Sequence, residues 1–61
     1  MERLLSVGEA GQLLHISKSG IYGLVGTQRI PHVRIGARVL FSEHRLEEWI
    51  KEKVVEEKER L

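Results

Sequence analysis

The first regular pattern along the chain is helical. Apolar residues recur at i, i+3 and i+7 from Val7, which predicts a helix over residues 7–14. Ser6 and Glu9 have the S-x-x-E spacing of a capping box, in which the serine hydroxyl accepts an amide of the first turn and the glutamate reaches back. We therefore expect Ser6 to be the N-cap of this helix.

A second helix is expected after a short break. Residues 15–17 interrupt the apolar pattern, and Ser17 is a favourable N-cap for a helix that ends near Val25. The expected buried stripe is Ile21, Leu24 and Val25. The side that faces away from this stripe carries Ser19, Gly23 and Gly26, with Tyr22 on its flank. Two short helices joined by a tight turn form a helix-turn-helix.

The pattern then changes to the alternation of a β-hairpin. Pro31 permits an extended start, and Gly36-Ala37 suits a two-residue type II′ turn. We expect four apolar residues to face inward: Val33, Ile35, Val39 and Phe41. Arg34 and Arg38 are expected to point away from the core together, with His32 on their face.

A third helix is expected after Ser42, which is a favourable N-cap. Its buried stripe is expected to be Leu46, Trp49, Ile50 and Val54. Residues 56–61 are highly charged and are expected to form a frayed helix end. The element order predicts an α+β, mainly α fold: a small winged helix-turn-helix, forming a single domain over residues 1–61 with its core in 4–55.

Composition narrows the function classes. The chain has 61 residues, is 41% hydrophobic and 31% charged, and contains no cysteine, which excludes disulfides and thiolate metal sites. No apolar run approaches the roughly 18–20 residues of a membrane span, and no signal peptide is evident. The histidines are scattered and no catalytic motif is present. We therefore expect a soluble, cytoplasmic protein that is not an enzyme and uses no catalytic residue, metal or cofactor.

Charge is distributed unevenly along the chain. Residues 1–42 carry five basic and two acidic side chains, a net +3, whereas residues 43–61 carry five basic and seven acidic ones, a net −2. The first part of the chain would be attracted to a polyanion. The acidic part is expected to be a solvated helix face with i,i+4 pairs such as Glu47–Lys51 and Glu56–Arg60.

Four segments in this order carry a resemblance to a known family. They are residues 4–10 (LLSVGEA), 13–22 (LLHISKSGIY), 30–36 (IPHVRIG) and 46–50 (LEEWI). Together they resemble the excisionase-type DNA-binding domain, which is related to the DNA-binding domains of MerR-type regulators. The resemblance implies that the second helix enters the DNA major groove and that the hairpin wing contacts the adjacent backbone or minor groove.

The resemblance also implies DNA-contacting residues by position. These are Ser17, Lys18, Ser19 and Tyr22 on the second helix, and Arg34 and Arg38 on the wing. Arg29 is a candidate for a backbone contact from the loop. Each has a simpler alternative: helix capping for the serines, a half-buried flank for Tyr22, and protection of a sheet edge for the arginines.

The chain departs from the family pattern at four positions. His15 stands where glycine is frequent, Gly20 where threonine is common, Gly23 where a long polar residue is common, and Ala37 where arginine is frequent. Histidine tolerates a left-handed backbone, so the turn can form. The second helix offers no arginine to read guanine edges, and we therefore expect weaker sequence discrimination than a typical relative shows.

Two functions follow as hypotheses. The first is binding to double-stranded DNA in transcription regulation or site-specific recombination, with self-association or cooperative binding on DNA, or with an integrase or another DNA-bound protein as partner. The sequence does not separate the excision factor from the regulator. The alternative is a protein-interaction module that docks or dimerises through Val54, Val55 and Leu61 with little or no DNA binding.

Overall fold

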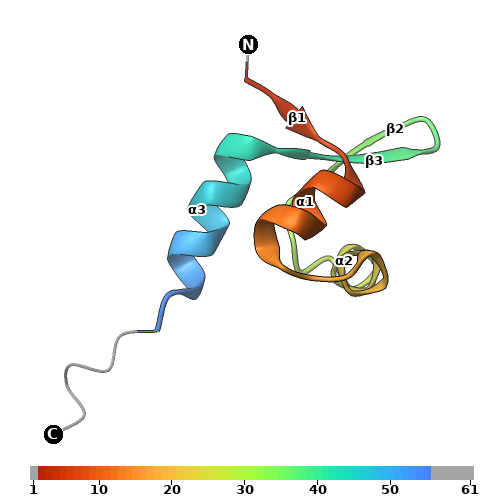
Figure 1. Ribbon diagram of the computed structural model, residues 1–61. Coiled ribbons are helices and arrows are strands. Elements are labelled where there is room, and N and C mark those ends of the chain that lie inside the picture. Colours follow the sequence, from red (N-terminus) through yellow and green to blue (C-terminus); the bar gives the residue numbers. More distant parts are fainter. Residues whose placement is uncertain (1, 56–61) are drawn as a thin grey trace, which may run out of the picture.

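The fold of residues 2–55 is described by a computed structural model (Figure 1). These residues form three helices and a small antiparallel sheet, which confirms the expected α+β winged helix-turn-helix. In chain order the elements are β1 (Leu4–Leu5), α1 (Val7–Leu14), α2 (Lys18–Gly26), β2 (Val33–Ile35), β3 (Arg38–Ser42) and α3 (Glu43–Lys53). The two-residue strand β1 was not predicted. The helix end expected over 56–61, with the Glu56–Arg60 pair, lies outside the described residues.

Each helix begins at the serine expected to cap it. The Ser6 hydroxyl accepts the Glu9 amide at 3.1 Å, and the Glu9 carboxylate accepts the Ser6 amide at 2.9 Å, which confirms the capping box. Ser17 accepts the Gly20 amide at 3.2 Å. Ser42 accepts the Arg45 amide at 3.1 Å. Each of these bonds satisfies one amide that has no partner within its helix.

The turn between α1 and α2 brings the two helices into close contact. His15 adopts the left-handed conformation (φ 59°, ψ 41°), and the following Ile16 amide donates to the Gly11 carbonyl at 2.9 Å. A β-carbon on Gly11 would lie only 2.7 Å from the Ile16 carbonyl oxygen, and one on Gly20 would lie 2.6 Å from the Ile16 Cγ2. The absence of side chains at these two glycines therefore sets how closely the helices approach.

The sheet has the order β1-β3-β2, and all its pairs are antiparallel. The hairpin turn at Gly36-Ala37 has two residues, because Ile35 pairs directly with Arg38. Gly36 has a φ of +59° and Ala37 has no positive φ, which fits the expected type II′ turn.

The expected facing of the hairpin was correct for β3, where Val39 and Phe41 face inward and Arg38 outward, and wrong for β2. Residues that pair directly across an antiparallel ladder project from the same face. Arg34 pairs with Val39 and therefore lies on the face of the inward-pointing Phe41, whereas Arg38 pairs with Ile35 on the opposite face. The two arginines do not point the same way. Ile35 is correspondingly 54% exposed instead of buried.

Val33 also lies on the outer face, paired with Leu40, and it is 37% exposed. His32 precedes β2, is partly buried, and has its Nδ1 atom 2.9 Å from the Ile30 carbonyl oxygen. It is therefore neither a fully exposed residue nor a strand residue, as the alternation had suggested.

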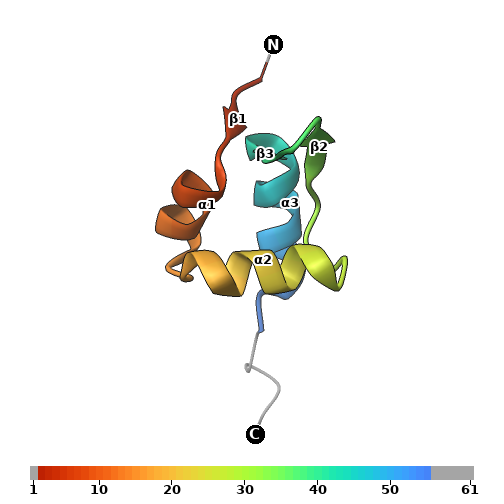
Figure 2. The same ribbon diagram turned by 90° about the vertical axis from the view of Figure 1, so that its right-hand side faces the viewer.

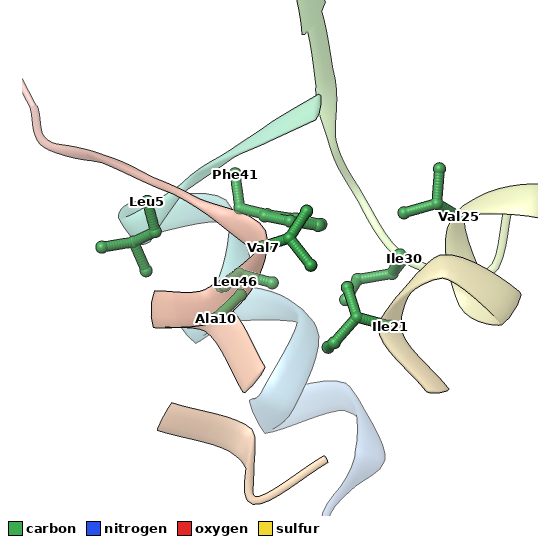
Figure 3. Packing of buried hydrophobic residues seen from close by; sticks show 8 residues of the cluster. All are labelled: Leu5, Val7, Ala10, Ile21, Val25, Ile30, Phe41 and Leu46. Atoms are coloured by element: carbon green, nitrogen blue, oxygen red, sulfur yellow. The ribbon is translucent and has the colours of Figure 1, made fainter. Parts of the chain in front are cut away.

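The buried core draws on β1, α1, α2, β3, α3 and the loop before the hairpin (Figure 3). Its members are Leu5, Val7, Ala10, Ile21, Val25, Ile30, Phe41 and Leu46. Full burial of a valine, leucine, isoleucine or phenylalanine side chain stabilises a fold by roughly 1.5–3 kcal/mol, because its surface is removed from water. The three largest fully buried side chains are Phe41, Ile21 and Leu46, from three different elements.

The apolar stripe predicted for the third helix is only partly confirmed. Leu46 is fully buried, and Trp49 packs partly buried against the core, where its indole Nε1 donates to the Arg29 carbonyl at 3.0 Å. Val54 was wrongly included, because α3 ends at Lys53 and Val54 is 60% exposed. Among residues 2–55 the ion pairs are Arg3–Glu9 and His44–Glu48, and the expected Glu47–Lys51 pair is not formed.

The start of α3 is joined to the N-terminal strand by a polar contact. The Ser42 hydroxyl donates to one Glu2 carboxylate oxygen at 2.7 Å, and the His44 amide donates to the other at 3.2 Å. The Ser42 hydrogen bond is the main reason that the pKa of Glu2 is lowered below its ordinary value. The Ser6 amide, followed by the Arg3 guanidinium, likewise lowers the pKa of Glu9.

The close approach of α1 and α2 predicts opposite effects for two glycine substitutions. Gly11→Ala should lower the free energy of unfolding by about 1–3 kcal/mol, because its β-carbon would meet a backbone oxygen. Gly23→Ala should raise it by about 0.5–1 kcal/mol, because no atom lies within 4 Å and alanine favours the helix. Urea unfolding followed by circular dichroism measures both. Equal effects of the two substitutions would contradict the close approach at Gly11.

The lowered pKa values of Glu2 and Glu9 predict a loss of stability in acid. A carboxyl whose pKa is lower in the folded state stabilises the fold above its unfolded pKa, and this contribution is lost as the pH falls through the folded value. The Glu2→Gln/Glu9→Gln double variant should therefore lose less stability between about pH 5 and pH 3 than the original chain. Urea midpoints at several pH values test this, with Glu47→Gln as the control. Parallel pH profiles for the original and double-variant chains would refute the assignment.

Candidate nucleic-acid interface

The exposed side of α2 and the tip of the hairpin lie on the same side of the molecule. In Figure 1 α2 is viewed nearly along its axis, and the hairpin projects to the right above it. Figure 2, viewed from that side, shows α2 lying across the molecule with the hairpin above it and α3 behind. A single partner approaching from this side could therefore contact both elements.

Small side chains give the exposed side of α2 a low profile. Ser19, Gly23 and Gly26 are exposed as expected, and a β-carbon on either glycine would meet no atom within 4 Å. Tyr22, on the flank, is 54% exposed. Gly20 differs from the other glycines of α2 because it faces Ile16 of the turn. The glycine at position 20 therefore belongs to the packing of α2 against the turn.

The two serines at the start of α2 form a local hydrogen-bonded pair. The Ser17 Oγ accepts the Gly20 amide and lies 3.3 Å from the Ser19 Oγ. The capping role of Ser17 is thus present in the structure, and contact of either hydroxyl with DNA remains a prediction. Lys18 lies between these two serines in the sequence, and its side chain is exposed.

Three of the predicted site residues line one concavity of about 290 Å³. We call it the Lys18 concavity. Lys18 and Tyr22 line it from α2, Arg38 and Val39 from β3, and Ser6, Val7 and Gly8 from the start of α1. β1 pairs only with Phe41 and Ser42, so the edge of β3 beside Arg38 and Val39 is open to the concavity.

The remaining predicted cations lie apart from the Lys18 concavity. Arg29 is exposed in the loop after α2, and its carbonyl oxygen is fixed by the Trp49 indole. Arg34 is exposed on the other face of the hairpin from Arg38. Within the part of the chain that the structure describes, neither ion pair includes Lys18, Arg29, Arg34 or Arg38. Their charges are available to an anionic partner.

The histidines and carboxylates of residues 2–55 are dispersed over the fold. Across residues 2–55 no group of three His, Cys, Asp or Glu side chains could hold a metal ion. Within the same range, no helix has the length and apolar character needed to cross a membrane.

Comparison with protein families identifies the domain type. A family described as a helix-turn-helix domain, of excisionase-like proteins, matches residues 4–54. The chain belongs to this family. Neither a curated protein nor a solved structure matches the chain. The helix-turn-helix assignment identifies it as a DNA-binding domain for double-stranded DNA, from a family that is typically non-enzymatic.

Sequence reasoning missed the contribution of α1 to this surface. Ser6 and Gly8 line the Lys18 concavity, although the pattern indicated only a capped helix at these positions. One feature of the sequence could have pointed to Gly8: a glycine inside a helix costs up to about 1 kcal/mol relative to alanine, and no reason for this glycine was evident. Its neighbour is Lys18, whose Cε would lie 3.5 Å from a β-carbon on Gly8.

The open space at Gly23 predicts a gain of DNA binding on substitution. Gly23→Arg should fold normally and strengthen binding to a mixed-sequence duplex severalfold at moderate salt. The slope of log affinity against log salt should steepen by about 0.9, because one more phosphate contact forms. Fluorescence anisotropy measures both quantities, with Gly23→Gln as the uncharged control. An unchanged slope would mean that the exposed side of α2 does not face DNA.

Proposed function

We propose that this domain inserts α2 into the major groove of double-stranded DNA while the hairpin contacts the adjacent backbone or minor groove. The observation that carries the proposal is the placement of α2 and the hairpin tip on one side of the molecule, with Lys18, Arg29, Arg34 and Arg38 free of ion pairs among residues 2–55. Arginine and lysine are the side chains best suited to phosphate contact.

Low sequence discrimination is part of this proposal. The exposed side of α2 presents hydroxyl groups, backbone, one tyrosine and Lys18 at its start, and the helix has no arginine, asparagine or glutamine to distinguish guanine or adenine. Affinity then arises mainly from phosphate contacts. Four such contacts give a slope of log affinity against log salt of about −3 to −4.

The proposed role lies in transcription regulation or site-specific recombination. A single domain of this size buries roughly 600–1,000 Å² on DNA, which gives modest affinity. We therefore include cooperative binding of several copies, or a second DNA-bound protein such as an integrase. The role requires the protein to share a compartment with DNA, in keeping with the cytoplasmic location expected from its sequence.

Salt-dependent binding tests the proposal directly. A labelled mixed-sequence duplex of 25–30 bp, titrated at two salt concentrations, should bind with micromolar affinity that falls steeply with salt. Arg38→Ala should weaken binding to all sequences to a similar degree and reduce the slope by about 0.9.

The outcomes separate the parts of the proposal. Unchanged affinity of Arg38→Ala at low salt would remove Arg38 from the interface. No binding of the original chain, even at low salt, would overturn the DNA-binding proposal and favour a protein-interaction role.

A further inference from the structure

The Lys18 concavity gathers positive charge from two separate elements. Lys18 lines it from α2 and Arg38 from β3, and the Tyr22 phenol adds a hydrogen-bond donor. None of its lining residues is acidic. Lys18 and Arg38 also have no ion-pair partner among residues 2–55. Two cationic residues thus line this concavity, and neither forms an ion pair with another residue of 2–55.

Lys18 lies close to the start of α1. A β-carbon on Gly8 would be 3.5 Å from the Lys18 Cε. The start of a helix carries a partial positive charge, which favours an anion. An anion bound between Lys18 and the start of α1 is therefore attracted by both.

Nearby carboxylates do not supply that anion. Glu9, in the first turn of α1, accepts hydrogen bonds from the Ser6 amide and from Arg3, whose guanidinium lies 3.0 Å away. Both Glu9 oxygens are therefore engaged outside the Lys18 concavity. The anion must come from a partner.

We propose that the Lys18 concavity binds one phosphate group of the DNA backbone. This inference rests on the proposed DNA binding and specifies where that DNA is held. The Lys18 concavity lies between α2 and β3. The bound phosphate therefore belongs to the stretch of DNA backbone that runs between the groove entered by α2 and the wing. Lys18 contributes charge, Arg38 and Tyr22 line the phosphate site, and Gly8 keeps it open.

A glutamate at position 8 tests the proposal by supplying a competing anion. A β-carbon there makes only ordinary contacts, at 3.5 Å from Lys18 and 3.9 Å from the Ser6 Oγ, so the substitution fits. Gly8→Glu should weaken affinity for the mixed-sequence duplex at least tenfold relative to Gly8→Gln. The comparison isolates charge, because the two side chains have the same size.

The matched control lies just after α3. Val54 is 60% exposed and lines neither the Lys18 concavity nor the adjoining hollow, which Lys18 and Gly8 also line, so Val54→Glu changes the net charge equally elsewhere, with Val54→Gln as its uncharged partner. Val54→Glu should weaken affinity by no more than about threefold, as expected for long-range charge alone. Circular dichroism confirms the fold of each variant. Lys18→Met should cost far less affinity when Gly8→Glu is already present than it costs alone.

Three results would decide against the proposal. Equal losses for the glutamates at positions 8 and 54 would overturn the phosphate site and leave the proposed DNA binding intact. Failure of the original chain to bind the duplex at low salt would overturn both. The Gly8 amide resonance should shift on addition of duplex; an equal shift with inorganic phosphate at matched ionic strength would assign the site to free phosphate.

Discussion

The close approach of α2 to α1 is the contact on which the rest of the surface depends. In this contact the Gly11 carbonyl accepts a hydrogen bond from the Ile16 amide, and Gly20 leaves room for the Ile16 side chain. His15 allows it by adopting a left-handed backbone. This contact sets the direction of α2, and thereby places Lys18 against α1 and Tyr22 beside β3. The proposed DNA-binding surface is built on packing at two glycines that do not line the Lys18 concavity.

Local signals in the sequence predicted the helices well. Capping serines and apolar spacing depend on neighbouring residues only, and they placed α1 and the starts of α2 and α3 correctly. The short strand β1 has too few residues to show a period, so it was missed. The stripe assigned to α3 extended to Val54 because periodicity does not show where packing partners end.

The candidate site was predicted as a set of residue types, without its geometry. Lys18, Tyr22 and Arg38 were correctly placed at the surface, but their shared concavity with Gly8 depends on how α1, α2 and β3 pack. Such contacts between distant residues have no local signature. Arg34 was misplaced for another reason: the alternation was applied to each strand separately, and the pairing of β2 with β3 across the two-residue turn was not considered. The DNA contacts themselves remain predictions.

The two-residue turn at Gly36 has a consequence for how such wings diversify. Facing in the hairpin is set by register, because a shift of one residue in the pairing turns every side chain of a strand to the other face. A one-residue shift of β2 against β3 would move Arg34 to the outer face and bring Val33 and Ile35 inward. The wing therefore changes in discrete steps, and a change of register alone would present different arginines without any substitution in the strands.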